Sequence, residues 1–249
     1  MTPVLQTIGL SKQFGALTVA DQIDFQLEPG ARHALIGPNG AGKTTFVNLL
    51  TGRLTPSSGQ VKIIGQDATQ LSESERVKMG LGRTFQINSL FNKMTVMDNV
   101  SLGISERLGI SKKMWRTANA FKNLQEETIA ILDLLGIADD ANEIVSQLPY
   151  GKQRLVEIAI SLGLKPKVLL LDEPAAGVPS MESGRILKAL DALPPDIAIL
   201  MIEHDMDLVF QFASRITVLV QGAVLCEGTP EEIAKDKRVH QVYLGEPDE

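Results

Sequence analysis

The sequence predicts an α/β fold with a mostly parallel central sheet, and three features of the chain support this prediction. Over most of the 249 residues, short apolar stretches alternate with stretches of helical periodicity, a pattern typical of a parallel sheet covered by helices on both faces. Near the start, at residues 4–29, apolar positions alternate around a turn, as they do in antiparallel strands. From about residue 72 to 147 the pattern is largely helical, which indicates an insertion into the α/β core.

Four strands and one helix are expected within the first 68 residues. The alternation of Ile23, Phe25 and Leu27 with polar residues indicates a strand with one buried face. Gly52 suits the end of a helix, because glycine adopts the left-handed conformation of a C-cap. The expected strands cover residues 4–14, 19–30, 31–36 and 59–68, with turns at Gly15 and Gly65, and the expected helix covers residues 44–52.

Helices and strands alternate again after the middle of the chain. Expected helices cover residues 72–82, 96–108 and 115–137, followed by a strand at 167–174, a helix at 181–193, a strand at 197–204, a helix at 206–213 and a hairpin at 215–228. We therefore expect a single domain over residues 1–249. About 1–85 and 160–249 form its α/β core with an antiparallel β lobe, and about 86–159 form a helical subdomain.

The composition argues against several classes of protein. The net charge is −6 and there is no basic run, so nucleic-acid binding is not expected. Cys226 is the only cysteine, which leaves no disulfide framework and no cysteine-based metal site. The longest apolar runs, "VLLL" and "IAILMI", are far shorter than the roughly 18 residues of a membrane-spanning helix. We expect a soluble, cytoplasmic chain that reaches a membrane only through a partner.

The stretch "GPNGAGKTT", residues 37–45, fits the phosphate-binding pattern G-x-x-x-x-G-K-[ST] and lies between an expected strand and an expected helix. Its glycines let backbone N–H groups face phosphate oxygens, and the following helix directs its positive end at the same anion. Lys43 can reach the β- and γ-phosphates, and the Thr44 hydroxyl can ligate Mg²⁺. The sequence therefore predicts a nucleotide site made of Gly37, Pro38, Asn39, Gly40, Ala41, Gly42, Lys43, Thr44 and Thr45.

A second acidic motif, "VLLLDEP", ends an apolar strand at residues 168–174. Such a strand delivers its last carboxylate to the carboxyl edge of the sheet, where ligands bind in open α/β folds. We expect Asp172 to orient Mg²⁺ through water. Glu173 beside it is expected to accept a proton from the attacking water as the general base. The core is thus predicted to be that of a P-loop NTPase.

Four further motifs follow in order along the chain: "SKQFG" with Phe14, "RTFQ" with Gln86, "LPYGKQ" at 148–153, and "IEHD" with His204. Each is weak alone, but with the two motifs above they resemble the ATP-binding cassette (ABC) ATPases of membrane transporters over essentially the whole chain. The resemblance implies that Phe14 stacks on adenine. It also implies that Gln86 contacts Mg²⁺ or the attacking water and senses the membrane partner, and that His204 contacts the γ-phosphate.

The "LPYGKQ" stretch corresponds to the family signature, usually written LSGGQ. The resemblance implies that Tyr150, Gly151, Lys152 and Gln153 open a helix that faces the γ-phosphate held by a second cassette. Pro149 and Tyr150 replace the usual serine and glycine, so the serine contact is lost. Whether Lys152 and Arg154 reach phosphate or face solvent stays open, as does the effect of Pro179 and Ser180, which replace the usual Asp/Asn-Pro after the acidic strand.

The tyrosine-containing signature followed by "RLVEIA", the stretch "GLGRTFQINSLFNKMTVMDNV", and "DEPAAG", "MIEHDMDLV" and "VYLGE" resemble one subfamily, which serves importers of branched-chain and other hydrophobic amino acids. The resemblance implies a transport-coupled ATPase at the cytoplasmic face of the membrane. Its implied partners are a second ATPase subunit, either the same or a sister chain, two transmembrane permease subunits and, indirectly, an extracytoplasmic solute-binding protein. Docking is expected at about residues 84–125, and no nucleic acid is expected.

Alternative functions remain at this level. A lone cassette of similar length can serve lipid or lipopolysaccharide export, and other cassettes act in solution on nucleic acid or ribosomes, usually with two cassettes or long insertions that this chain lacks. A P-loop kinase that transfers phosphate to a small molecule is a third alternative. Within the importer class, urea, short amides or aromatic acids are alternative solutes.

Overall fold

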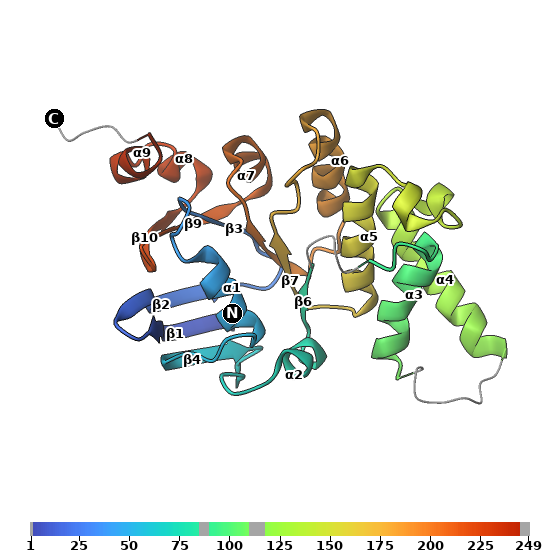
Figure 1. Cartoon of the computed structure of the whole chain (residues 1–249), viewed down its shortest axis with the longest axis horizontal. Coiled ribbons are helices and arrows are strands. Elements are labelled where there is room, and N and C mark those ends of the chain that lie inside the picture. Colours follow the sequence, from blue (N-terminus) through green and yellow to red (C-terminus); the bar gives the residue numbers. More distant parts are fainter. Residues whose placement is uncertain (1, 85–89, 110–117, 245–249) are drawn as a thin grey trace. The chain divides into compact units, whose positions relative to one another are not determined.

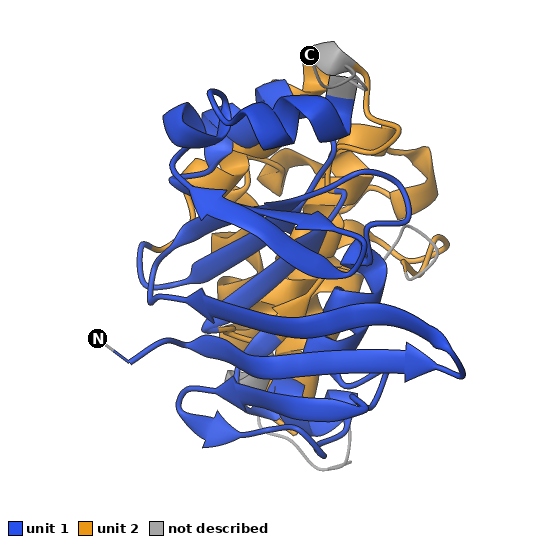
Figure 2. Cartoon of the chain, turned by 90° about the vertical axis from the view of Figure 1, so that its left-hand side faces the viewer, with its two compact units in different colours: residues 1–81, 167–173, 195–249 blue, residues 82–166, 174–194 orange. Residues whose placement is uncertain are grey.

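A computed structural model describes residues 2–84, 90–109 and 118–244 of the chain. The chain divides into two compact units (Figure 2). Unit 2 spans the range, about 86–159, over which a helical subdomain was expected. Unit 2 also takes in a later segment. Unit 1 comprises residues 1–81, 167–173 and 195–249, and unit 2 comprises residues 82–166 and 174–194.

The larger sheet has six strands in the order β10-β9-β3-β8-β7-β6 (Figure 1). Strands β9, β3, β8 and β7 run parallel, and β10 pairs antiparallel with β9. β8 is buried along its whole length, as strands of a parallel sheet covered on both faces are. The predicted mostly parallel sheet is confirmed. The strands are β3 (Arg32–Ile36), β6 (Leu81–Arg83), β7 (Val168–Asp172), β8 (Ala198–Ile202), β9 (Arg215–Val220) and β10 (Ala223–Gly228).

The smaller sheet of unit 1 is antiparallel, with the strand order β2-β1-β4-β5. Its buried face contributes Ile23, Phe25 and Leu27 to the core, as the alternation predicted. Phe25 meets Phe46 of the first helix edge to face, with 5.7 Å between the ring centroids. This sheet is the predicted N-terminal antiparallel lobe. Its strands are β1 (Leu5–Phe14), β2 (Leu17–Leu27), β4 (Ser58–Ile63) and β5 (Gln66–Asp67).

The helices of unit 1 follow the two sheets along the chain. They are α1 (Lys43–Thr51), α2 (Glu73–Lys78), α7 (Met206–Phe212), α8 (Pro230–Ile233) and α9 (Lys237–Leu244). The prediction of a helix over residues 72–82 is wrong at its end, because Gly80 turns with a φ of 100° and the next three residues join the sheet as β6. Helices α8 and α9 were not predicted from the sequence.

Unit 2 is built from helices. They are α3 (Val96–Arg107), α4 (Ala118–Leu134), α5 (Tyr150–Gly163) and α6 (Ser180–Asp191), with short 3₁₀ turns at Ala138–Asp140 and Val145–Gln147. The predicted helical character of the middle of the chain is confirmed for the described residues. In the part of the chain that the structure describes, no helix combines the length and apolar character needed to cross a membrane.

A buried arginine closes the C-terminal end of α1. Arg76 is 1% exposed. Its guanidinium donates to the carbonyl oxygens of Leu49 at 2.6 Å, Leu50 at 2.7 Å and Thr69 at 2.9 Å. The last carbonyls of a helix have no partner within the helix. Arg76 therefore satisfies groups that burial would otherwise leave unpaired, and it holds the helix that begins at the glycine-rich loop.

We expect Arg76→Met to lower the free energy of unfolding by about 3 kcal/mol or more, because each buried carbonyl left without a donor costs about 1–3 kcal/mol. Thermal denaturation followed by circular dichroism measures this change. Arg53→Met is the matched control, since the Arg53 side chain is 51% exposed and its loss should change stability by under about 0.5 kcal/mol. Equal melting temperatures for Arg76→Met and the unmodified chain would contradict the role given to Arg76.

Candidate functional site

The loop between β3 and α1 is held in close contact with neighbouring strands. Gly40 and Gly42 have φ values of 79° and 99°, in the left-handed region that favours glycine. A Cβ on Gly42 would lie 2.6 Å from the carbonyl oxygen of Val19, and a Cβ on Gly37 would lie 2.2 Å from that of Leu219. A side chain at either glycine would push the loop away from the strands. The glycines therefore fix the path of the predicted phosphate-binding loop.

α1 begins at Lys43, with Gly42 as its N-cap. Among the described residues no side chain caps this end, and the first turn carries no acidic residue. Its amides and the positive end of the helix dipole are thus directed to the loop, which suits an anion. Asn39 and Thr44 are exposed, whereas Ala41 is buried. The other residues of the predicted cradle, Pro38, Gly40 and Thr45, lie on the same loop and first turn.

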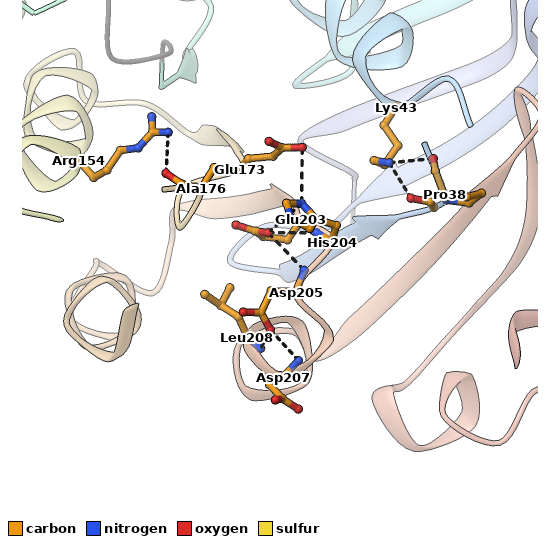
Figure 3. A network of polar contacts seen from close by, with 11 residues as sticks. Pro38, Lys43, Arg154, Glu173, Ala176, Glu203, His204, Asp205, Asp207 and Leu208 are labelled. Carbon is orange, nitrogen blue, oxygen red and sulfur yellow. Dashed lines mark hydrogen bonds and ion pairs between the residues drawn. The ribbon is translucent and has the colours of Figure 1, made fainter. Parts of the chain in front are cut away.

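The Lys43 ammonium folds back over the loop that precedes it (Figure 3). It donates to the carbonyl oxygens of Gly37 at 2.6 Å and Pro38 at 3.1 Å. Burial lowers the pKa of Lys43, while the carboxylates of Glu173 and Asp172 act in the opposite direction. The acidic end of β7 and the glycine-rich loop therefore belong to one electrostatic site.

Asp172 is the last residue of β7, and Glu173 follows it in an unusual backbone conformation. The φ of Glu173 is 48°, which is uncommon for a residue other than glycine and costs conformational free energy. Its backbone N–H donates to the carbonyl oxygen of Ile202 at 2.9 Å. This bond to the end of β8 stabilises the turn and fixes where the Glu173 side chain starts.

His204 follows β8 and approaches the same carboxylate. Its Nδ1 lies 3.6 Å from Oε1 of Glu173 (Figure 3). The buried carboxylate of Glu203 accepts the backbone N–H of His204 at 3.0 Å and that of Asp205 at 3.5 Å. Asp205 in turn caps α7 by accepting the N–H groups of Asp207 and Leu208. The loop that carries His204 is thus fixed on both sides.

The role of Glu203 was not predicted from the sequence. The residue is 1% exposed, and a buried carboxylate requires hydrogen-bond donors, which the loop amides provide. An acidic residue directly before the histidine, at the end of an otherwise apolar strand, is the sequence signal that could have identified it.

Of the two remaining predicted contacts, Phe14 and Gln86, the structure describes only Phe14. Phe14, at the end of β1, is 51% exposed, and the Lys12 ammonium lies 5.0 Å from its ring centroid. An exposed aromatic ring at this place leaves a face for stacking on a base. Gln86 lies outside the described residues.

The signature opens α5, as predicted, with Pro149 as the N-cap. A Cβ on Gly151 would lie 2.6 Å from Oε2 of Glu182, so this glycine also has a packing requirement within the chain. Gln153 donates to the carbonyl oxygen of Leu148 at 2.9 Å. Lys152 pairs with Asp140, with 2.7 Å between Nζ and Oδ1.

The solvent-facing alternative for Arg154 is wrong. Its guanidinium is buried and donates to Oε2 of Glu157 at 2.9 Å. It also lies 5.4 Å from the ring centroid of Tyr150 and reaches the carbonyl oxygen of Ala176 at 3.5 Å (Figure 3). The sequence could not show this, because the partners that bury Arg154 come from the next turn of α5 and from a loop more than twenty residues later.

Comparison with known proteins agrees with this geometry. Residues 20–176 match a family model described as "ABC transporter", and residues 223–249 match one described as "Branched-chain amino acid ATP-binding cassette transporter". The chain is 38% identical to the "High-affinity branched-chain amino acid transport ATP-binding protein LivG" of Escherichia coli strain K12. It is 36% identical to the corresponding protein BraF of Pseudomonas aeruginosa. Each alignment covers 98% of both chains.

A solved structure is similar over almost the full length. It is described as the ADP conformation of MJ1267, an ATP-binding cassette of an ABC transporter, and it has 28% sequence identity and a TM-score of 0.86. The match covers 99% of this chain and 100% of that one. The glycine-rich loop, the acidic strand end and the family match lead to one conclusion: the chain belongs to the ABC transporter family as an ATP-binding cassette ATPase.

Proposed function

We propose that the chain is the ATP-hydrolysing subunit of an importer for branched-chain or other hydrophobic amino acids. The relatives named above are branched-chain amino acid transport proteins, and they align over nearly the full length of this chain. The match at residues 223–249 to a model of the same description supports the same assignment from a separate stretch of the chain. The solute would pass through separate permease subunits.

The approach of Glu173 and His204 to each other is the single observation that carries the proposed reaction. With 3.6 Å between Oε1 and Nδ1, one carboxylate and one imidazole meet where a γ-phosphate and its attacking water would lie. Glu173 would accept the proton of that water as general base. His204 would donate to the γ-phosphate, and its loop is held for this task by Glu203.

Lys43 would move from its present partners to the nucleotide. The carbonyl oxygens of Gly37 and Pro38 now accept its N–H groups, and phosphate oxygens are stronger acceptors because they are charged. At the β- and γ-phosphates Lys43 would offset the charge that develops during transfer, which is the dominant contribution in phosphoryl transfer. Phe14 would stack on the adenine.

Mg²⁺ fits the donors at this site. The Thr44 hydroxyl would be an oxygen ligand of the kind that Mg²⁺ prefers, the Asp172 carboxylate would orient the ion through water, and Gln86 is proposed as a third contact. Across residues 2–84, 90–109 and 118–244, no three His, Cys, Asp or Glu side chains gather as a metal site. The ion would neutralise phosphate charge.

We propose that a second cassette, either the same or a sister chain, completes the site with its signature. The signature residues Tyr150, Gly151, Lys152 and Gln153 lie in the first turn of α5, where amides and the helix dipole favour an anion. The two cassettes would act on two transmembrane permease subunits at the cytoplasmic face of the membrane, supplied with solute by an extracytoplasmic binding protein.

Glu173→Gln is expected to bind ATP as the unmodified chain does and to hydrolyse it at least about 100-fold more slowly, because the amide cannot take a proton from water. Release of inorganic phosphate measures the rate, and equilibrium binding of labelled ATP measures the affinity. Glu28→Gln, at an exposed position, is the control and should hydrolyse ATP normally. Near-normal turnover by Glu173→Gln would refute Glu173 as the general base.

Lys43→Ala is expected to weaken ATP binding at least about tenfold, because the cation that contacts the phosphates is removed. Isothermal titration calorimetry with MgATP gives the affinity directly. Lys235→Ala removes an exposed lysine elsewhere in unit 1 and should bind as the unmodified chain does. An unchanged affinity in Lys43→Ala would contradict the assignment of the phosphate-binding loop.

The solute is tested by uptake in cells whose own copy of the chain is replaced by Glu173→Gln. Uptake of labelled leucine, isoleucine and valine should fall to the level of a deletion strain, and uptake of labelled urea should stay unchanged. The reverse result, loss of urea uptake with normal leucine uptake, would assign the chain to a different importer.

A further inference from the structure

Unit 2 contains a cavity that the proposed hydrolysis does not use. Its volume is about 330 Å³, large enough for the side chain of another protein. Four apolar residues form most of its wall: Leu90, Phe91, Leu102 and Ile160. Phe91 is 57% exposed and Leu102 is 40% exposed, so two large apolar side chains at the cavity are open to an approaching surface.

Three polar residues complete the lining, and two of them are already hydrogen-bonded. The amide of Asn99 donates to the carbonyl oxygens of Phe91 and Thr95, and its Oδ1 accepts the N–H of Phe91 at 2.9 Å. The hydroxyl of Ser161 donates to the carbonyl oxygens of Glu157 and Arg83, both at 3.2 Å. The third polar residue is Glu157, and within the described residues only one of its two carboxylate oxygens has a hydrogen-bond partner.

Glu157 is 4% exposed, and only its Oε2 has a partner, Arg154. Its Oε1 is buried and accepts no hydrogen bond within the part of the chain that the structure describes. A buried carboxylate oxygen without a donor is costly. Burial also raises the pKa of the Glu157 carboxyl to about 7, although Arg154 acts in the opposite direction. A donor for this oxygen would therefore stabilise the site.

We propose that the cavity receives one basic side chain, lysine or arginine, from an apolar helix of the permease, and that its charged nitrogen pairs with Oε1 of Glu157. This inference rests on the proposed function and gives the docking partner its chemistry. A basic side chain fits because its methylene stem packs on apolar walls while its head reaches a carboxylate. The resulting charge-assisted hydrogen bond is stronger than a neutral one. The exposed Phe91 and Leu102 then cover the apolar face of the incoming helix.

The same pairing connects the cavity to the signature. Arg154 holds the other oxygen of Glu157 and contacts the ring of Tyr150 and the carbonyl oxygen of Ala176. The ring of Tyr150 also lies 3.3 Å from where a Cβ of Gly177 would stand. A cation that competes with Arg154 for Glu157 thus acts on a side chain that contacts both Tyr150 and the loop after Glu173.

The test measures how much permease stays bound to the chain. The affinity-tagged chain is expressed in cells that contain its permease, the complex is extracted in mild detergent, and quantitative mass spectrometry gives permease per chain. Glu157→Gln should lower this ratio at least about tenfold. Leu102→Arg should lower it similarly, because it places a competing cation at the cavity. Leu134→Arg makes the same change at a position that is 37% exposed and outside the cavity, and it should retain the permease.

Each outcome decides one claim. If both Glu157→Gln and Leu102→Arg retain the permease as the unmodified chain does, the inference is overturned. If Glu157→Gln melts at a lower temperature and its loss of permease is explained by misfolding, Leu102→Arg alone decides, since Leu102 is exposed. Phosphate release by the extracted complex, which contains the unmodified chain and its second cassette, is measured in parallel. Its absence would overturn the proposed function itself, whereas normal hydrolysis with unchanged permease retention would overturn only this inference.

Discussion

The site depends on the close packing of the glycine-rich loop on its neighbours. The backbone at Gly37 and Gly42 passes so near the carbonyl oxygens of Leu219 and Val19 that a single Cβ would clash. These two contacts come from different sheets of unit 1, so the folding of both sheets fixes the loop. Everything placed by the loop, including the start of α1 and the position of Lys43, follows from this constraint.

Charge balance around the loop explains the arrangement of the other groups. The Lys43 ammonium lies near the carboxylates of Glu173 and Asp172, which favour its charged form, while its burial disfavours that form. The carboxylates come from the end of β7, and the imidazole of His204 comes from the end of β8, which pairs directly with β7. Parallel neighbouring strands end at the same edge of a sheet. Glu203 fixes the histidine loop through backbone amides, so its negative charge is used for structure.

The sequence predicted most of this site because its motifs are local. Within each motif, whether the glycine-rich loop, the acidic strand end or the histidine after β8, the residues lie close together in the sequence, and their backbone requirements can be read from residue type. It could not predict the pairing of Lys152 with Asp140, which lies 12 residues earlier in the chain. It also could not predict the burial of Arg154, which depends partly on the Ala176 loop, 22 residues later. α8 was missed although Thr229 and Glu232 form a capping box at its start, because four residues carry no periodicity.

The central claim is that this chain transfers the γ-phosphate of ATP to water. The most direct measurement incubates the purified chain, together with its sister cassette if it pairs with one, with γ-labelled ATP and Mg²⁺ in the absence of any acceptor or membrane. The account predicts that the label appears as inorganic phosphate, at a rate that saturates with ATP concentration. ATP that stays bound and intact, with label released only when a small-molecule acceptor is added and then found on that acceptor, would contradict it.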